Sequence, residues 1–315
     1  MNIIFFGSSH FGVAALKEIL RSEVSVSAVV TQPDKPKGRG MHVSSTLVKE
    51  TAQAAGIPVF QPVQVNALES VRFIKGLDPD LFIVIAYGQI LSQEILDIPR
   101  IASINAHASL LPKYRGAAPI NWAIMNGEKT TGVSIIKMVR KMDAGPLIIK
   151  KEVPILEEHT AVSLEEALSA LTAQLIPESI RMIARRDYTL IPQDESKVVH
   201  APKLKKENGL IEWQSTAEEI QNHIRGCLPW PGSFTYYRSQ ILKIYKSATV
   251  GPYCFDPVRF GCGSVVHTEK KGILVATGSG CIRILELQLQ GKRIMKAEEF
   301  IAGHKIQPGE VFGKK

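Results

Sequence analysis

LFIVIA, at residues 81–86, is an unbroken apolar run with the tripeptide YGQ directly after it. A run of this length is typical of a strand that other elements cover on both faces. Similar runs lie at residues 1–6, 24–31 and 59–60, and helical patterns separate them at residues 11–20, 45–55 and 66–75. Alternating strands and helices of these lengths predict an α/β fold with a doubly wound, Rossmann-like parallel sheet.

The second half of the chain follows a different pattern. An apolar stripe over residues 163–186 predicts one long helix, and the polar, proline-marked residues 189–209 predict a linker. Further on, five β-like runs alternate with turn residues, at 233–237, 241–245, 263–267, 272–276 and 282–288. Such strands predict a small, OB-like β-barrel, a fold that often binds nucleic acid. We therefore predict a first domain over residues 1–188, the linker over 189–209 and a barrel domain over 210–315.

Composition restricts the class of protein. With 315 residues, 45% of them hydrophobic and 22% charged, the chain can bury two ordinary globular cores. No apolar run approaches the roughly 20 residues that span a bilayer, and the start, MNIIFFG, lacks a signal-peptide pattern. We therefore expect a cytoplasmic protein without a membrane partner. The four cysteines form no CxxC pair or His/Cys cluster, so we expect no metal site.

The net charge of +8 is concentrated in one part of the chain. Residues 201–315 hold 17 Lys and Arg against 10 Asp and Glu, a balance of +7. Such an excess favours a polyanionic partner such as nucleic acid, although a solvated basic surface explains it equally well.

Two polar side chains follow a predicted strand and point to chemistry. Asn105 and His107 are two positions apart, so on an extended segment they share one face. An amide donor beside an imidazole can stabilise an oxyanion and move a proton, and Asp143 supplies a carboxylate that can orient the imidazole. On its own an Asn-x-His pair is more often a satisfied strand end. If Asn105, His107 and Asp143 are catalytic, their combination favours acyl-type transfer without a covalent enzyme intermediate.

Longer motifs surround these residues. The run HASLLPKYRGAAPINWAI at 107–124, with YGQIL before it and MDAGP after it, resembles the folate-dependent formyltransferase family. The resemblance implies transfer of a formyl group from 10-formyltetrahydrofolate, with Asn105, His107 and Asp143 as the catalytic residues. It also implies that the SLLP segment, Ser109, Leu110, Leu111 and Pro112, lines the folate site. Tyr87, Gly88 and Gln89 follow the carboxyl end of a predicted parallel strand, where ligands of such sheets bind, so we expect them at the folate as well.

Other segments resemble the members of that family that act on methionyl-tRNA. TQPDKPKGRG at 31–40 looks like their basic loop, which contacts the acceptor end of the tRNA, and residues 203–231 resemble their C-terminal domain. The resemblance implies that initiator methionyl-tRNA is the partner and that its α-amine is formylated for translation initiation. The basic residues that we expect at the tRNA are Lys35, Lys37, Arg39, Lys203, Lys205 and Lys206. We expect a monomer, since no sequence feature demands an oligomer.

Two departures from the family pattern and three other functions stay open. Ser8-Ser9 replaces the usual Thr-Pro of the first loop, and MDAGP replaces the more usual LDTGD, which leaves the pterin contacts open. A formyltransferase for a small amine, such as an amino-sugar nucleotide or glycinamide ribonucleotide, would share the same three catalytic residues. The basic loop and the basic C-terminal third favour tRNA. A formyl-folate hydrolase or dehydrogenase would need another catalytic domain, and a non-catalytic RNA-binding module would leave the catalytic set without a role.

Overall fold

The computed structural model describes residues 1–37, 42–251 and 259–313, and their contacts divide the chain into two compact units. Unit 1 comprises Met1–Pro119, Thr130–Pro154 and Glu165–Ala201. Unit 2 comprises Ile120–Lys129, Ile155–Leu164 and Pro202–Lys315. Arg39, one of the residues expected at the tRNA, lies outside the described residues.

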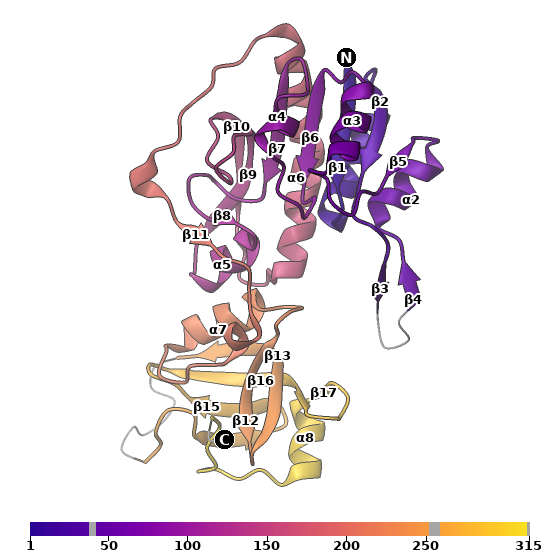
Figure 1. Ribbon diagram of the computed structural model, residues 1–315. Coiled ribbons are helices and arrows are strands. Elements are labelled where there is room, and N and C mark those ends of the chain that lie inside the picture. The colour runs from indigo at the N-terminus through magenta and orange to yellow at the C-terminus, as the bar shows by residue number, and fades with distance from the viewer. Residues whose placement is uncertain (38–41, 252–258, 314–315) are drawn as a thin grey trace. The chain divides into compact units, whose positions relative to one another are not determined.

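Unit 1 is built on a seven-stranded sheet with the order β10-β9-β7-β6-β1-β2-β5 (Figure 1). Five strands are parallel: β1 (Asn2–Gly7), β2 (Ser25–Val30), β5 (Val59–Phe60), β6 (Leu81–Ile85) and β7 (Ala102–His107). Two strands that the sequence analysis did not predict, β9 (Thr130–Lys137) and β10 (Leu147–Pro154), extend one edge in antiparallel order. Every residue of β6 is buried, as its unbroken apolar run predicted. The Rossmann-like parallel sheet is therefore confirmed.

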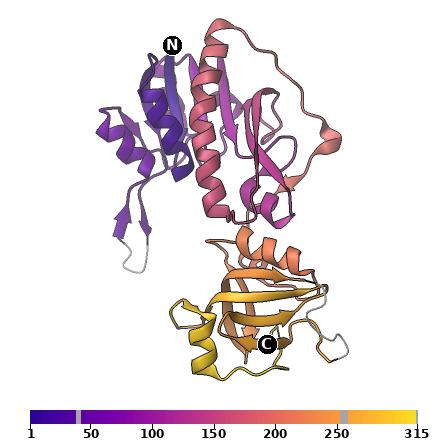
Figure 2. The same cartoon turned by 180° about the vertical axis from the view of Figure 1, so that it is seen from behind.

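Helices cover this sheet. The predicted helices correspond to η1 (His10–Gly12) with α1 (Val13–Leu20), α2 (Leu47–Ala54), α3 (Leu68–Gly76) and α6 (Ala161–Arg185). The short helix α4 (Gln93–Leu96) lies between β6 and β7 in the chain. Figure 2 shows α6 running along one face of the sheet, where the Ser169 hydroxyl donates to the Phe11 carbonyl at 2.8 Å. Most residues of β1, β2, β6 and β7 are buried, so both faces of these parallel strands are largely removed from water.

The strand order reverses between β1 and β6, and Ser8 ties the ends of three strands together at this point. Its backbone N–H donates to the Ala86 carbonyl at 3.3 Å, and its hydroxyl donates to the Tyr87 carbonyl at 2.9 Å. The same hydroxyl accepts the backbone N–H of Gln32 at 2.9 Å. Ligands of open α/β sheets bind at such a switch point, beyond the carboxyl ends of the strands. Ser8, a departure from the family pattern, thus has a structural role in organising this edge.

Unit 2 contains an antiparallel sheet with the order β12-β13-β16-β15-β14. Its strands are β12 (Ser233–Tyr237), β13 (Gln240–Val250), β14 (Val265–Glu269), β15 (Gly272–Ala276) and β16 (Cys281–Leu289), and the short β17 (Met295–Lys296) pairs with β16. The unit also contains α5 (Pro119–Met125, from Ile120 onward), α7 (Ala217–Gly226) and α8 (Ala297–His304). Trp213 stacks on Phe312 with ring centroids 5.9 Å apart inside the core. All five predicted strands are present, and the mixed α/β fold class is confirmed.

The predicted linker, residues 189–209, is divided between the two units. Residues 189–201 belong to unit 1, where Ile191 forms a β-bridge with Leu147. The short strand β11 (His200–Ala201) pairs in parallel with β8 (Arg115–Gly116). Residues 202–209 belong to unit 2. Of the helices that the structure describes, none combines the length and the apolar character that crossing a membrane requires.

Candidate active site

The carboxyl end of β7 carries Asn105 and His107. The strand lies between β6 and β9, with Asn105 beside Val84 and His107 beside Ser134 in the register. Alternation along the strand places both side chains on one face of the sheet. Asn105 is half-buried, and His107 is 6% exposed. The two groups are therefore held on a rigid inner strand with little freedom to reorient.

The hydrogen bonds of His107 define its two ring nitrogens. Nε2 lies 2.8 Å from the Tyr114 carbonyl oxygen, which can only accept, so we assign a proton to Nε2. Nδ1 lies 3.6 Å from Oδ2 of Asp143. The nitrogen that faces the carboxylate is therefore Nδ1.

Asp143 completes the group although it lies in a different loop. Its Oδ2 accepts the backbone N–H of Gly116 at 2.9 Å, and its Oδ1 lies 3.5 Å from the amide nitrogen of Asn105. Its backbone has φ 51°, in the left-handed region, which Asp tolerates better than most residues. The structure thus brings together Asn105, His107 and Asp143, the three residues that the sequence analysis singled out for catalysis.

The loop at residues 142–146, called the Asp143 loop below, approaches the sheet closely, and Gly145 makes this approach possible. A Cβ at this position would lie 1.8 Å from the Lys137 carbonyl oxygen, at the end of β9. The Lys137 N–H donates to the Pro146 carbonyl at 3.0 Å across the same contact. Only glycine leaves room for this backbone-to-backbone approach.

We expect Gly145→Ala to lower the free energy of unfolding by about 1–3 kcal/mol, because the loop must move away from β9 to admit a methyl group. Denaturant unfolding measures the effect. Gly76→Ala is the control, since a Cβ at the end of α3 meets no atom within 4 Å. A Gly145→Ala protein as stable as the wild type would show that the loop can shift freely.

The SLLP segment expected at the folate is fixed by one local hydrogen bond and by two hydrogen bonds with β9. The buried Ser109 hydroxyl donates to the Lys113 carbonyl at 2.6 Å. Ser134 of β9 donates to the Ser109 carbonyl and accepts the Leu111 N–H. Leu111 is fully buried, whereas Leu110 and Pro112 are half-buried. These last two side chains are the members of the segment that can still contact a ligand.

Tyr87, Gly88 and Gln89 follow β6 and have different environments. Tyr87 is 2% exposed, and its ring packs edge-on against Phe6 with centroids 5.5 Å apart. Burial raises the pKa of Tyr87, whose hydroxyl has no hydrogen-bond partner among the described residues. Gln89 instead holds the neighbouring loop, since it accepts the Val65 N–H at 2.9 Å.

Gly88 is exposed with φ 89°. A Cβ there would lie 3.9 Å from Nε2 of Gln32, a buried amide nitrogen without a partner in the described part of the chain. Among the described residues, the strand ends at the switch point therefore leave two buried polar groups without a hydrogen-bond partner, the Gln32 amide nitrogen and the Tyr87 hydroxyl. Unsatisfied polar groups of this kind need an explanation, and a polar ligand is one.

The basic residues expected at the tRNA belong to both units. Lys35 is exposed at the start of a hairpin in unit 1, formed by β3 (Lys35–Lys37) and β4 (His42–Ser44), and Lys37 ends β3. In unit 2 the three predicted lysines Lys203, Lys205 and Lys206 are exposed, and Lys205 lies 3.8 Å from Glu207.

Asp34 anchors the base of the hairpin. Its carboxylate pairs with Lys49 at 2.6 Å and accepts from the Gln61 amide at 2.8 Å. The hydrogen bond from Lys49 holds the pKa of Asp34 below its usual value. The hairpin therefore starts from a fixed point on unit 1.

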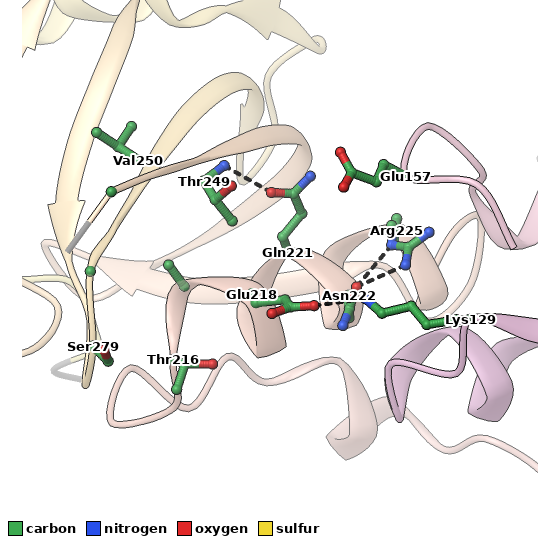
Figure 3. A pocket seen from close by; sticks show the side chains of 13 residues that line it. Lys129, Glu157, Thr216, Glu218, Gln221, Asn222, Arg225, Thr249, Val250 and Ser279 are labelled. Atoms are coloured by element: carbon green, nitrogen blue, oxygen red, sulfur yellow. Dashed lines mark hydrogen bonds and ion pairs between the residues drawn. The ribbon is translucent and has the colours of Figure 1, made fainter.

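Unit 2 holds a separate pocket of about 510 Å³ along α7 (Figure 3). Among its lining residues, Lys129 pairs with Glu218 at 2.9 Å, and the Arg225 guanidinium donates to the neutral Asn222 side chain. None of the residues that the sequence analysis assigned to a site lines it. Across the described residues, no group of three His, Cys, Asp or Glu side chains is placed to hold a metal ion.

The sequence analysis missed the residues that support the Asp143 loop. Gln193 donates to the Asp143 and Gly145 carbonyls, and Arg115 in turn donates to the Gln193 side chain. Arg115 lies inside the motif at 107–124, so its place in that motif could have indicated a role near the site. Gln193 lies in the predicted linker, where no pattern marked it.

Comparisons with known proteins cover the whole chain. The family model "Formyl transferase" matches residues 1–180, and "Formyl transferase, C-terminal domain" matches residues 203–305. The methionyl-tRNA formyltransferase of Citrifermentans bemidjiense is 43% identical over 315 residues, which are 100% of this chain and 97% of the relative. The protein of the same name from Alkaliphilus oremlandii is 43% identical over 314 residues, covering 100% of both chains.

Solved structures share the fold. An N-formyltransferase from Helicobacter canadensis, in complex with folinic acid and dTDP-3-aminofucose, matches with a TM-score of 0.67 and 20% identity. The match covers 90% of this chain and 98% of that one. HypX from Aquifex aeolicus, in complex with tetrahydrofolic acid, matches with a TM-score of 0.65 and 14% identity over 99% of this chain. This chain spans only 50% of the length of HypX.

Proposed function

The chain belongs to the formyl transferase family, and from this premise we propose that it formylates the α-amino group of methionyl initiator tRNA with 10-formyltetrahydrofolate as donor. The product, N-formylmethionyl-tRNA, starts translation. The observation that carries the proposal is the identity of 43% over the full length to methionyl-tRNA formyltransferases. The grouping of Asn105, His107 and Asp143 at the end of β7 supports it.

The residues at the switch point fit the formyl donor. A pterin ring carries several hydrogen-bond donors and acceptors on a flat aromatic frame. Among the described residues, the Gln32 amide nitrogen and the Tyr87 hydroxyl are buried polar groups without a partner, of the kind that such a ring satisfies. We propose that they bind the folate together with exposed Gly88 and with Leu110 and Pro112. Ser109, Leu111 and Gln89 would keep the surrounding loops in place.

The three polar side chains have complementary roles in the proposed reaction. The donor supplies a formyl carbon whose oxygen gains negative charge when the amine attacks. Asn105 would donate from its amide to that oxygen, as an oxyanion donor does. His107 would hold a proton at Nδ1, since its Nε2 is already engaged by the Tyr114 carbonyl. The bond between the formyl carbon and N10 of the donor would then break, and N10 would take up a proton as tetrahydrofolate leaves.

Asp143 would balance the charge of the imidazole and accept the proton that the attacking amine loses. Its carboxylate is suited to this role because the Gly116 N–H fixes one oxygen and the other faces Asn105. All three groups come from one chain, which supports a monomer as the active form. The cytoplasm, where initiator tRNA is used, is the location that we infer.

We propose that residues 1–188 carry catalysis and that residues 210–315 bind tRNA, with 189–209 between them. The balance of +7 over residues 201–315 supports the second assignment, because tRNA is a polyanion.

Incubation with a labelled formyl donor tests the function. We expect label on methionyl initiator tRNA and none on uncharged tRNA, on an amino-sugar nucleotide or on glycinamide ribonucleotide. Labelling of a small amine alone would replace the proposal by a formyltransferase for that substrate. RNA binding without labelling would indicate a non-catalytic binding module, and release of free formate a hydrolase.

Arg39 is the residue of the basic loop that we propose to grip the acceptor end, because a guanidinium pairs with phosphate or stacks on an unpaired base. We expect Arg39→Ala to weaken transfer to initiator tRNA sharply, with folate binding and thermal stability unchanged. Arg39→Lys should restore only part of the rate, since lysine keeps the charge but lacks the planar fork. Full activity of the alanine variant, in a transfer assay at limiting tRNA, would reject the assignment of the loop.

Lys203, Lys205 and Lys206 are proposed to contact tRNA phosphates. Replacing all three by alanine should raise the KM for tRNA and flatten its dependence on salt. Each lost contact is expected to change the slope of log affinity against log salt by about 0.7–0.9. A titration of tRNA binding between low and moderate salt measures this. An unchanged slope would mean that these exposed lysines are merely solvated.

A further inference from the structure

We propose that Gln193, held in place by Arg115, is a positioning residue for Asp143. The inference rests on the proposed function, in which Asp143 acts in formyl transfer. It also gives a role to residues 191–201, which form a strap across the Asp143 loop and β8.

Gln193 forms two hydrogen bonds to the Asp143 loop. One amide nitrogen, Nε2, donates to the Asp143 carbonyl at 2.8 Å and to the Gly145 carbonyl at 2.7 Å. The two carbonyls flank Ala144, so the two hydrogen bonds fix the turn that carries the Asp143 side chain. A side chain that only accepts cannot make either bond.

Arg115 fixes Gln193 from the other side. Its Nε and Nη2 donate to Oε1 of Gln193 at 3.0 and 2.8 Å, and its side chain is only 2% exposed. Nη2 also pairs with Glu195 at 2.8 Å, and Glu195 pairs with Lys141, the residue before the Asp143 loop. The hydrogen bonds from Arg115 and Lys141 lower the pKa of Glu195 to about 2, so this link stays ionised at neutral pH.

The backbone of the strap also helps to position the carboxylate of Asp143. The Arg115 N–H donates to the Val199 carbonyl at 2.9 Å, and β11 pairs with β8 at Gly116. The Gly116 N–H is the donor to Oδ2 of Asp143. The strap therefore controls both the loop that carries Asp143 and the group that orients its carboxylate.

Such control matters because the contacts of Asp143 with the His107 and Asn105 side chains are long and its backbone lies in the left-handed region. The carboxylate lies 3.6 Å from Nδ1 of His107, and φ at Asp143 is 51°. A displacement of about 1 Å in a catalytic group can lower a rate about 10²-fold. Gln193, from outside the 142–146 loop, supplies two side-chain hydrogen bonds to its carbonyls.

Gln193→Glu tests the proposal, because glutamate still accepts from Arg115 but cannot donate to the two carbonyls. We expect kcat for formyl transfer to fall about 10- to 100-fold, with KM for tRNA and for the folate donor within about twofold of wild type. Ser196→Ala is the matched control. It removes a hydrogen bond to Asp194 in the same strap without touching the Asp143 loop, and it should leave kcat unchanged.

A double-mutant cycle separates positioning from general damage. If Gln193 acts through Asp143, adding Gln193→Glu to Asp143→Asn should cause less than about a twofold further loss, and both single variants should show the same altered pH–rate profile. Equal losses in the two backgrounds, or a wild-type pH profile for Gln193→Glu, would overturn the proposal. If Gln193→Glu does not fold, Gln193→Asn, whose shorter amide cannot span both carbonyls, takes its place in the cycle. A wild-type protein that fails to formylate methionyl-tRNA would instead refute the proposed function.

Discussion

Replacing His107 by alanine is expected to reduce formyl transfer to methionyl-tRNA by at least about 10²-fold, the usual scale for a single acid–base group. The change removes the side chain that contacts the Tyr114 carbonyl through Nε2 and faces the Asp143 carboxylate through Nδ1. It also leaves that carboxylate, with 11% of its side chain exposed, without the imidazole beside it. Single-turnover transfer with saturating tRNA and donor measures the effect.

The control for this variant is His267→Ala, which removes an exposed imidazole in β14 of unit 2. It should retain wild-type turnover. Binding of tRNA should survive His107→Ala, because the basic residues that we propose to contact tRNA are unchanged. Turnover of His107→Ala within about threefold of the wild type would remove His107 from the mechanism.

Asn105→Asp is expected to reduce the rate of formyl transfer at least as much, by about 10²- to 10³-fold, which is the range for loss of an oxyanion donor. Aspartate has almost the same shape as asparagine but donates no hydrogen bond when ionised. It would also place a second carboxylate about where the Asn105 amide now lies 3.5 Å from Oδ1 of Asp143. Mutual repulsion then raises the pKa of one of the two carboxyl groups.

The pH dependence provides a signature for this variant. Because the raised pKa belongs to a carboxyl group, the pair takes up a proton as the pH falls, and the protonated acid regains a donor. Transfer by Asn105→Asp should therefore recover in part at lower pH, whereas Asn105→Ala should not. Thermal unfolding of both variants serves as the control for folding. Equal pH–rate profiles for the two would show that Asn105 does not act through a donated hydrogen bond.

Local pattern sufficed for the elements that are buried on one or both faces. The apolar run at 81–86 became β6, and the stripe at 163–186 became α6. The five alternating runs after residue 232 became the strands β12 to β16. In each case the apolar residues form either an unbroken run or a repeat with the period of the element, and their burial is the dominant stabilising effect.

The strands β9 and β10 show where the pattern fails. β10 has two buried residues at its start and mostly exposed ones after them, so it presents neither an apolar run nor a clean alternation. Its conformation is decided by backbone pairing with β9, which in turn pairs with β7. The β7–β9 pairing joins residues such as Ile104 and Lys137 that lie far apart in the sequence, and no local propensity encodes it.

The sequence by itself determined that Asn105 and His107 share a face, since the period of a strand is two residues. Their distance to Asp143 was decided by tertiary structure, because that residue lies 38 positions beyond Asn105 in a loop that only Gly145 allows to approach β9. The role of residues 191–201 was likewise invisible in their composition. Polar, proline-marked sequence indicates a loop but does not say where the loop packs, and here long-range hydrogen bonds of Gln193 and Arg115 place it against the Asp143 loop.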